Sequence, residues 1–278
     1  REAPEAVARF LEHNARALAE LGARLRASPP PVALTSARGS SDQAGDSFDP
    51  SGRNVDVGRG LEWLKQGWQL FTKNPGMWIA IAVILMVVVV VLSFVPIVGT
   101  LAVNFLMPVF AGGILLGCKS LSEGGEFGIE ALFAGFKQNT GNLIMVGVFY
   151  LVGVIVITVL VFLIGGGAAF TGGLIGRGPG VGMALGGFFL AMLVMLVLLV
   201  PLAMAVWFAP ALVVFRDVAP LEAMKASFFA CLKNLLPFLV YGVILFVLCL
   251  IAMIPIGLGM LIMVPVMMGS IYASYVEI

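Results

Sequence analysis

The chain has 278 residues, of which 60% are hydrophobic and 11% are charged, and its formal net charge is +1. Soluble domains carry about a quarter charged residues, so this composition excludes an ordinary soluble protein and is typical of an integral membrane protein. Because the net charge is close to zero, no basic surplus points to a nucleic-acid partner.

Residues 1–27 are predicted to form an amphipathic cytoplasmic arm. Five apolar residues recur close to the three-four spacing of one helix face: Val7, Leu11, Leu18, Leu21 and Leu25. One short stripe cannot bury itself alone. Two interpretations therefore stay open, a solvated helix that packs on its own protein and a docking helix for a partner. Residues 28–58, rich in proline, glycine, serine and aspartate, are predicted to be a flexible linker.

The membrane domain, residues 59–278, is predicted to repeat one unit three times. Each copy starts with an apolar residue and a glutamate, and an asparagine stands 12 residues after that glutamate. The pairs are Glu62 with Asn74, Glu130 with Asn142, and Glu222 with Asn234. Two long apolar runs follow each asparagine. We therefore predict an all-α integral membrane fold of six transmembrane helices, built as three repeats of an interfacial amphipathic helix plus a helical hairpin, at about residues 61–118, 129–215 and 221–275.

The helix that opens each repeat is too short to cross about 30 Å of hydrocarbon, so it is predicted to lie in the interface plane. Aromatic side chains favour headgroup depth, and the expected interfacial anchors are Trp63, Trp68, Phe136 and Phe228. The repeated glutamate and asparagine have two interpretations. In the favoured one, the helix dipole stabilises the glutamate and the asparagine caps the following span. In the other, the three glutamates ring a cytoplasmic vestibule with Lys65, Lys225 and Lys233.

The second repeat departs from its siblings. Its glycine-rich residues 165–180 are predicted to be a long mobile loop. The 35 apolar residues that follow, 181–215, exceed one bilayer crossing and predict a long tilted helix, bent near Pro201 or Pro210. At the start of the third repeat, Asp217 or a neighbour is predicted to cap the interfacial helix, with Pro220 in its first turn.

The distribution of basic residues predicts the orientation. Six spans place both ends of the domain on one side, and Arg177 is the one basic residue expected on the other. The first side carries nine: Arg53, Arg59, Lys65, Lys73, Lys119, Lys137, Arg216, Lys225 and Lys233. This asymmetry predicts cytoplasmic termini and, in a bacterium, the inner membrane.

The predicted spans contain no aspartate, glutamate, lysine, arginine or histidine. Ion-coupled transporters keep such residues inside the membrane, and membrane hydrolases need a nucleophile with a base, or metal ligands. The one histidine, His13, lies in the arm, and Cys118, Cys231 and Cys249 have no metal-binding or CxxC spacing. We therefore expect no enzyme, and no catalytic, cofactor-binding or metal site.

The first interfacial helix carries a resemblance. Its sequence GLEWLKQGWQLF at residues 60–71, with Asn74 and Pro75, resembles a family of uncharacterised proteobacterial six-helix inner-membrane proteins. That family is similar to the membrane domain attached to some glycerophosphodiester phosphodiesterases. The resemblance covers about residues 53–278 and leaves out the arm. It implies an inner-membrane protein without an assigned reaction, so no catalytic residue is carried over.

We expect a non-catalytic membrane scaffold or accessory subunit that docks a partner through its arm. The expected partners are membrane lipids and other membrane-protein subunits or further copies of the chain. The alternative is a passive transporter, channel or lipid-handling protein with three hairpins around a centre. The few polar candidates for a pathway are Asn104, Thr158, Ser270 and Tyr272. A weaker third interpretation, an anchor for a soluble enzyme, follows from the phosphodiesterase relation.

Overall fold

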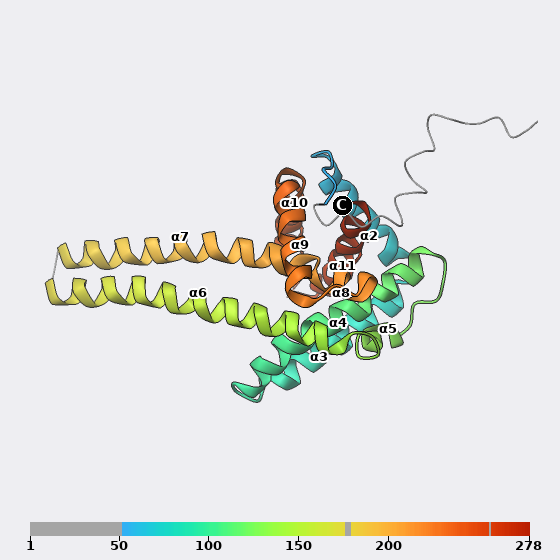
Figure 1. Ribbon diagram of the computed structural model, residues 1–278, viewed down its shortest axis with the longest axis horizontal. Helices are drawn as coiled ribbons and strands as arrows, with labels where there is room; N and C mark the ends of the chain where they lie inside the picture. Colours follow the sequence, from blue (N-terminus) through green and yellow to red (C-terminus); the bar gives the residue numbers. More distant parts are fainter. Residues whose placement is uncertain (1–51, 176–178, 256) are drawn as a thin grey trace, which may run out of the picture. The chain divides into compact units, whose positions relative to one another are not determined.

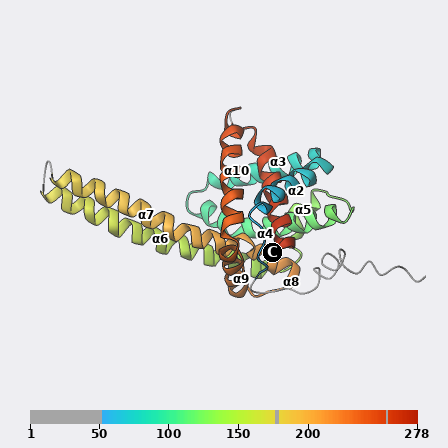
Figure 2. The same cartoon turned by 90° about the horizontal axis from the view of Figure 1, so that it is seen from above.

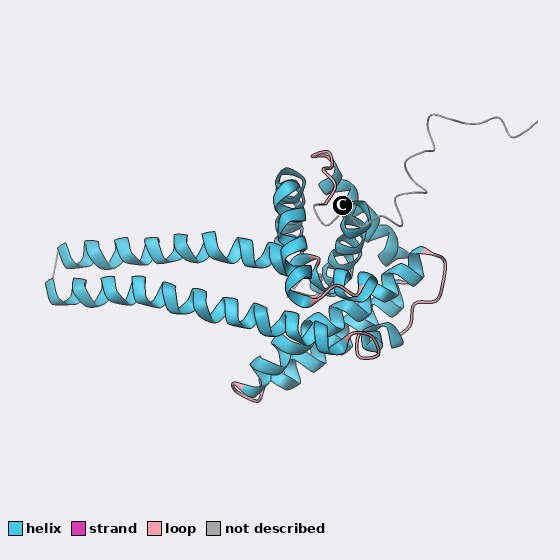
Figure 3. Ribbon diagram, in the orientation of Figure 1, coloured by secondary structure: helices cyan, strands magenta, loops and turns pink. Residues whose placement is uncertain are grey.

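A computed structural model describes residues 52–175, 179–255 and 257–278, all within the second of the two units, 1–48 and 49–278, into which the chain divides. The predicted arm and its five apolar residues lie outside this part. The described residues are helical and contain no strand (Figure 3). The helices are α2 (Arg59–Lys73), α3 (Pro75–Ser93), α4 (Val98–Ser122), α5 (Glu130–Ala134), α6 (Thr140–Ile175), α7 (Pro179–Trp207), α8 (Ala209–Arg216), α9 (Pro220–Lys233), α10 (Leu235–Met253) and α11 (Met260–Glu277) (Figure 1).

Six stretches of the described residues are long and apolar enough to cross a membrane, as the sequence predicts. They are Pro75–Ser93, Val98–Ser122, Thr140–Leu174, Gly180–Arg216, Leu235–Met253 and Met260–Glu277. Lipid offers no hydrogen-bond partners to the backbone. A lipid-exposed segment must therefore satisfy its hydrogen bonds internally, as an α-helix does.

The helices that precede the three pairs differ in length. Helices α2 and α9 have 15 and 14 residues, close to the prediction, whereas α5 has 5. The backbone at Gly135, where α5 ends, lies directly against α4. A Cβ added at Gly135 would overlap the carbonyl oxygen of Val109 and lie 3.1 Å from the nitrogen of Gly113. The chain then reverses through Asn139, whose φ of 56° is left-handed and does not continue a helix. Helix α5, at the place of the second predicted interfacial helix, is therefore much shorter than predicted.

The prediction of a mobile loop at residues 165–180 is wrong for the part that the structure describes. Helix α6 has 36 residues and continues through the glycines to Ile175, and α7 begins at Pro179. The two helices lie side by side in both views (Figures 1 and 2). Their glycines allow a close approach, since a Cβ at Gly172 would overlap the Gly180 carbonyl oxygen and one at Gly187 would overlap the Ala168 side chain. Small residues serve this role in membrane helix pairs.

The predicted bend in the fourth span is a break between α7 and α8 at Phe208, two residues before Pro210. Pro201 lies inside α7. Ser227 of α9 fills the break, because its hydroxyl accepts from the Phe208 N–H at 2.9 Å and donates to the Met204 carbonyl at 2.6 Å. Both groups that the interrupted helix leaves free are thereby satisfied.

Ser227→Ala is expected to lower the free energy of unfolding by about 1–3 kcal/mol, because it leaves the buried Phe208 N–H without a partner and the Met204 carbonyl with only the weak Cys231 thiol donor at 3.7 Å. Thermal unfolding in detergent measures the loss. Ser93→Ala is the control, since Ser93 is exposed and bonds only to the Val89 carbonyl of its own helix. Equal effects of the two substitutions would contradict the bridging role.

The start of α9 differs from the prediction in one residue. Pro220 occupies the first turn, as predicted, but the residue before it is Ala219, which makes no side-chain capping bond. Asp217 instead ends α8 in the left-handed conformation, with φ of 53°. A short polar residue tolerates that conformation better than most, so Asp217 terminates one helix and does not cap the next.

An aromatic cluster joins α2 to α10 and to the end of α7. The ring centroid of Trp63 lies 5.0 Å from that of Phe238 and 6.2 Å from that of Tyr241. The ring centroid of Trp207 lies 5.9 Å and 5.8 Å from the same two centroids. Trp63 is fully buried, and its indole N–H donates to Glu277 of α11 at 2.7 Å. Trp63 is therefore packed inside the protein, and its prediction as an interfacial anchor is wrong.

The other predicted anchors are accessible from outside the helix bundle. Trp68 is 50% exposed, Phe136 is 39% exposed and Phe228 is partly buried. An anchor must reach lipid, so these three stay predictions. The difference between Trp63 and Trp68 arises because α11 and α10 cover one face of α2 and leave the opposite face open.

Candidate functional site

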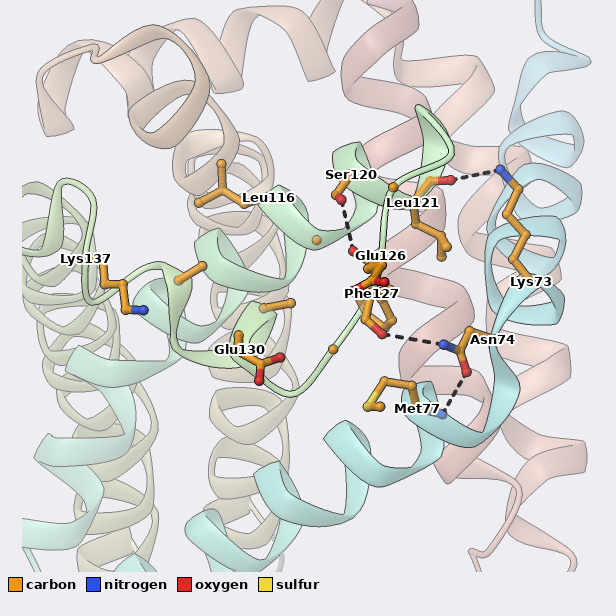
Figure 4. A pocket seen from close by; sticks show the side chains of 15 residues that line it. Lys73, Asn74, Met77, Leu116, Ser120, Leu121, Glu126, Phe127, Glu130 and Lys137 are labelled. Atoms are coloured by element: carbon orange, nitrogen blue, oxygen red, sulfur yellow. Dashed lines mark hydrogen bonds between the residues drawn. The ribbon is translucent and has the colours of Figure 1, made fainter.

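A pocket of about 750 Å³ lies where α2, α3 and α4 meet the loop that leads to α5. Figure 4 shows its side chains. Four of its lining residues are charged: Lys73, Glu126, Glu130 and Lys137. Met77 stands in the first turn of α3 and Leu116 in the last turns of α4, so the pocket lies where two candidate spans end.

Residues 125–128 form one wall of the pocket (Figure 4). Asn74 and Trp78 hold this wall, and Lys73 binds the end of α4 that precedes it. The Lys73 ammonium donates to the Leu121 carbonyl at 2.9 Å, and the Asn74 amide N–H is 3.5 Å from the Phe127 carbonyl. The Phe127 ring packs 4.3 Å from the Trp78 ring, and Gly124 turns the chain with φ of 84°. The loop is therefore positioned by specific contacts, although most of its residues are exposed.

Most of the charged groups of the pocket have no internal partner. Glu126, Glu130 and Lys137 are exposed and form no hydrogen bond or ion pair through their side chains within the described residues. Lys73 uses one of the three donors of its ammonium group for Leu121. The pocket thus presents to a ligand of mixed charge three groups without an internal partner, Glu126, Glu130 and Lys137, and one further cation, Lys73, that keeps two of its three donors.

The three repeated glutamates each occupy the first turn of a short helix, as the favoured interpretation predicts. Glu62 pairs with Lys65 at 2.7 Å and Glu222 with Lys225 at 3.2 Å. The hydrogen bond from Lys65 lowers the pKa of the Glu62 carboxyl. Of the vestibule residues in the other interpretation, only Glu130 lines this pocket; the five that do not are Glu62, Glu222, Lys65, Lys225 and Lys233.

The three repeated asparagines have three different roles. Asn74 caps α3, because its side chain accepts from the Met77 N–H at 3.3 Å. Asn142 lies inside the first turn of α6, which begins at Thr140, so it does not cap that helix as predicted. Asn234 precedes α10 but makes no capping bond to it.

Asn234 instead holds a segment that sequence reasoning assigned to the linker. Its side-chain oxygen accepts from the Val55 N–H at 2.9 Å, and its amide donates to the Arg53 carbonyl at 2.8 Å. The Arg53 N–H donates to the Ile278 carbonyl at 2.7 Å. Residues 52–58, here called the strap, are thus attached to α9 and to the end of α11. The sequence does not predict this role, because the strap is held through its backbone and its side-chain composition is that of a flexible linker.

Two further side chains outside the pocket, Cys231 and Arg59, are buried and paired, respectively. Burial raises the pKa of the Cys231 thiol to about 12, so the thiol stays protonated. Arg59 forms an ion pair with Glu277, and that hydrogen bond raises the pKa of the guanidinium group. No group of three or more histidine, cysteine, aspartate or glutamate side chains that could hold a metal ion occurs among the described residues.

The six apolar helices define a helical, multi-pass membrane protein. The chain is 30% identical over 204 residues to a Burkholderia thailandensis protein described as a probable inner membrane protein, and the match covers 70% of this chain and 75% of that protein. The chain therefore belongs to this family of inner membrane proteins, and the predicted inner-membrane location is confirmed. No family model matches the chain. No solved structure matches it.

Proposed function

We propose that the protein is a non-catalytic scaffold or accessory subunit of the inner membrane, and that its arm docks a partner. The observation that carries the proposal is the apolar interior of the spans, whose charged residues, Lys119, Arg216 and Glu277, stand at the span ends. Pumps and ion-coupled transporters use charges within the membrane. The buried, protonated Cys231 thiol is likewise unsuited to nucleophilic catalysis.

The polar side chains considered for a pathway bond to the protein itself. Asn104, Thr158 and Ser270 each donate to the carbonyl four residues earlier in their own helix, at 2.7–2.8 Å. Tyr272 lies 3.0 Å from the Ser122 hydroxyl. These contacts favour a scaffold over a passive transporter or channel. The lipid-handling alternative has support of its own, because the charged pocket lies where two spans end.

We also propose the threefold plan and the orientation. In support of the plan, α2, α5 and α9 each precede a pair of candidate spans and carry a glutamate in the first turn. In support of cytoplasmic termini, the nine basic residues lie in the strap, in α2 and α9, at the C-terminal ends of α4 and α8, and between α5 and α6.

Deletion of residues 1–50 is expected to abolish recovery of the partner in a mild-detergent pulldown, with at least a tenfold loss, because the docking stripe is removed. The strap stays intact in this variant, so the membrane domain is expected to keep its unfolding temperature. The control keeps residues 1–27 and replaces residues 28–50 by a glycine-serine linker of equal length. That control should retain the partner. Unchanged recovery after the deletion would show that the arm is not the docking element.

A further inference from the structure

We propose that the pocket between α2, α3, α4 and α5 binds the headgroup of a phosphatidylethanolamine-type lipid. In this assignment, Lys137 contacts the phosphate, and Glu130 and Glu126, which lie between Lys137 and Lys73 (Figure 4), contact the ammonium group. The proposal goes beyond the scaffold function and does not depend on the docking role of the arm.

The position of the pocket supports a membrane lipid as the ligand. The pocket takes in the first turn of α3 and the last turns of α4, which are the ends of two candidate spans. Lipid headgroups lie at this depth. Met77 and Leu116 lie on the side of the spans and offer apolar contacts to the glycerol and the start of the acyl chains. A volume of about 750 Å³ holds a headgroup with room for this region.

The charge of the pocket supports a zwitterion. Two lysines and two glutamates balance, whereas a purely anionic headgroup would leave both carboxylates opposed to its phosphate. Within the described part of the chain, Glu126, Glu130 and Lys137 form no internal ion pair that a ligand would have to break. Charge-assisted hydrogen bonds from lysine to phosphate and from ammonium to carboxylate are among the stronger polar contacts.

Ethanolamine fits this site better than choline. A primary ammonium group donates hydrogen bonds to carboxylates, whereas a quaternary ammonium group has no N–H and is usually recognised by a cage of aromatic rings. Phe127 is the one aromatic residue among those that line the pocket, and its ring packs on Trp78. The pocket therefore has the carboxylates that a primary amine requires and lacks an aromatic cage.

Native mass spectrometry of the full-length protein in detergent tests the proposal. The probes are dioleoyl phosphatidylethanolamine, phosphatidylcholine and phosphatidylglycerol at equal concentration. We expect the ethanolamine lipid to be retained at least fivefold more than the other two, and the double variant Glu130→Gln/Lys137→Gln to lose this preference. The control Glu222→Gln/Lys225→Gln removes one acidic and one basic residue at the exposed start of α9, and it should keep the preference.

Two further measurements distinguish the remaining outcomes. A phosphatidylethanolamine with a photoreactive group near its phosphate should cross-link to residues 116–137, which reports binding even if the double variant folds poorly. Failure of millimolar free phosphoethanolamine to displace the lipid would identify the lipid as the ligand. Equally tight binding of free phosphoethanolamine would assign the pocket to a soluble compound and overturn the proposal. Equal retention of the three lipids by the native chain, or a preference that survives in the double variant, would overturn it as well.

Discussion

Gly67→Ala is expected to destabilise the membrane domain by about 2–3 kcal/mol, because a single added methyl group has no space between α2 and α11. A Cβ at Gly67 would overlap the carbonyl oxygen of Val266 and would lie 2.8 Å from the nitrogen of Ser270. Gly269 of α11 faces the same point, since its own Cβ would lie 2.9 Å from the Gly67 Cα. The two backbones therefore touch, and α2 must move away to accept any side chain.

Tryptophan fluorescence and thermal unfolding both measure the effect of Gly67→Ala. Trp63, one of four tryptophans, is one turn from Gly67 and is fully buried, so displacement of α2 should shift the tryptophan emission of the protein to longer wavelength as well as lower the unfolding temperature. Gly76→Ala is the matched control, because nothing lies within 4 Å of a Cβ at that position in α3. Alanine there should be neutral or stabilise the helix by up to about 1 kcal/mol. A Gly67→Ala variant as stable as the Gly76→Ala variant would contradict this account of the α2–α11 contact.

The features that sequence predicted correctly depend on composition along the chain. Six apolar stretches, the break near Pro210 and the place of Pro220 follow from hydropathy and from the missing N–H of proline. The glycine-rich residues 165–175 were misjudged because their composition is that of a flexible loop in water. In an apolar helix pair the same glycines permit close packing, as the contact between Gly172 and Gly180 illustrates.

The features that sequence missed depend on contacts between distant segments. The spacing of Trp63 fits both an interfacial anchor and a core residue, and only the position of α10 and α11 decides between them. The pocket likewise combines Lys73 with Glu126, Glu130 and Lys137, which no local pattern connects. Among its residues, Asn74 and Glu130 could be singled out from the sequence, because the repeat marks both positions.

Asn234→Ala is expected to destabilise the domain by about 2–4 kcal/mol, since it leaves the N–H of Val55 and the carbonyl of Arg53 without the side-chain partner that each has in the native fold. Asn234 is fully buried, and its amide also donates to the Ala230 carbonyl at 3.0 Å. Loss of these bonds should loosen the strap at α9, where the Lys233 ammonium still donates to the Gly52 carbonyl. Thermal unfolding measures the energy, and faster proteolysis within residues 52–58 reports the loosening.

Asn142→Ala is the control for this prediction, because Asn142 holds the corresponding place in the second of the proposed repeats and its side chain makes no hydrogen bond within the described residues. Its effect should stay within about 0.5 kcal/mol. Equal losses at the two positions would show that the asparagine matters for the repeat rather than for the strap. The Arg53 N–H keeps its bond to the Ile278 carbonyl in this variant, so the strap stays attached to the end of α11. The Asn234→Ala variant should therefore keep the partner in the pulldown while its domain is less stable, which separates the stability of the domain from docking.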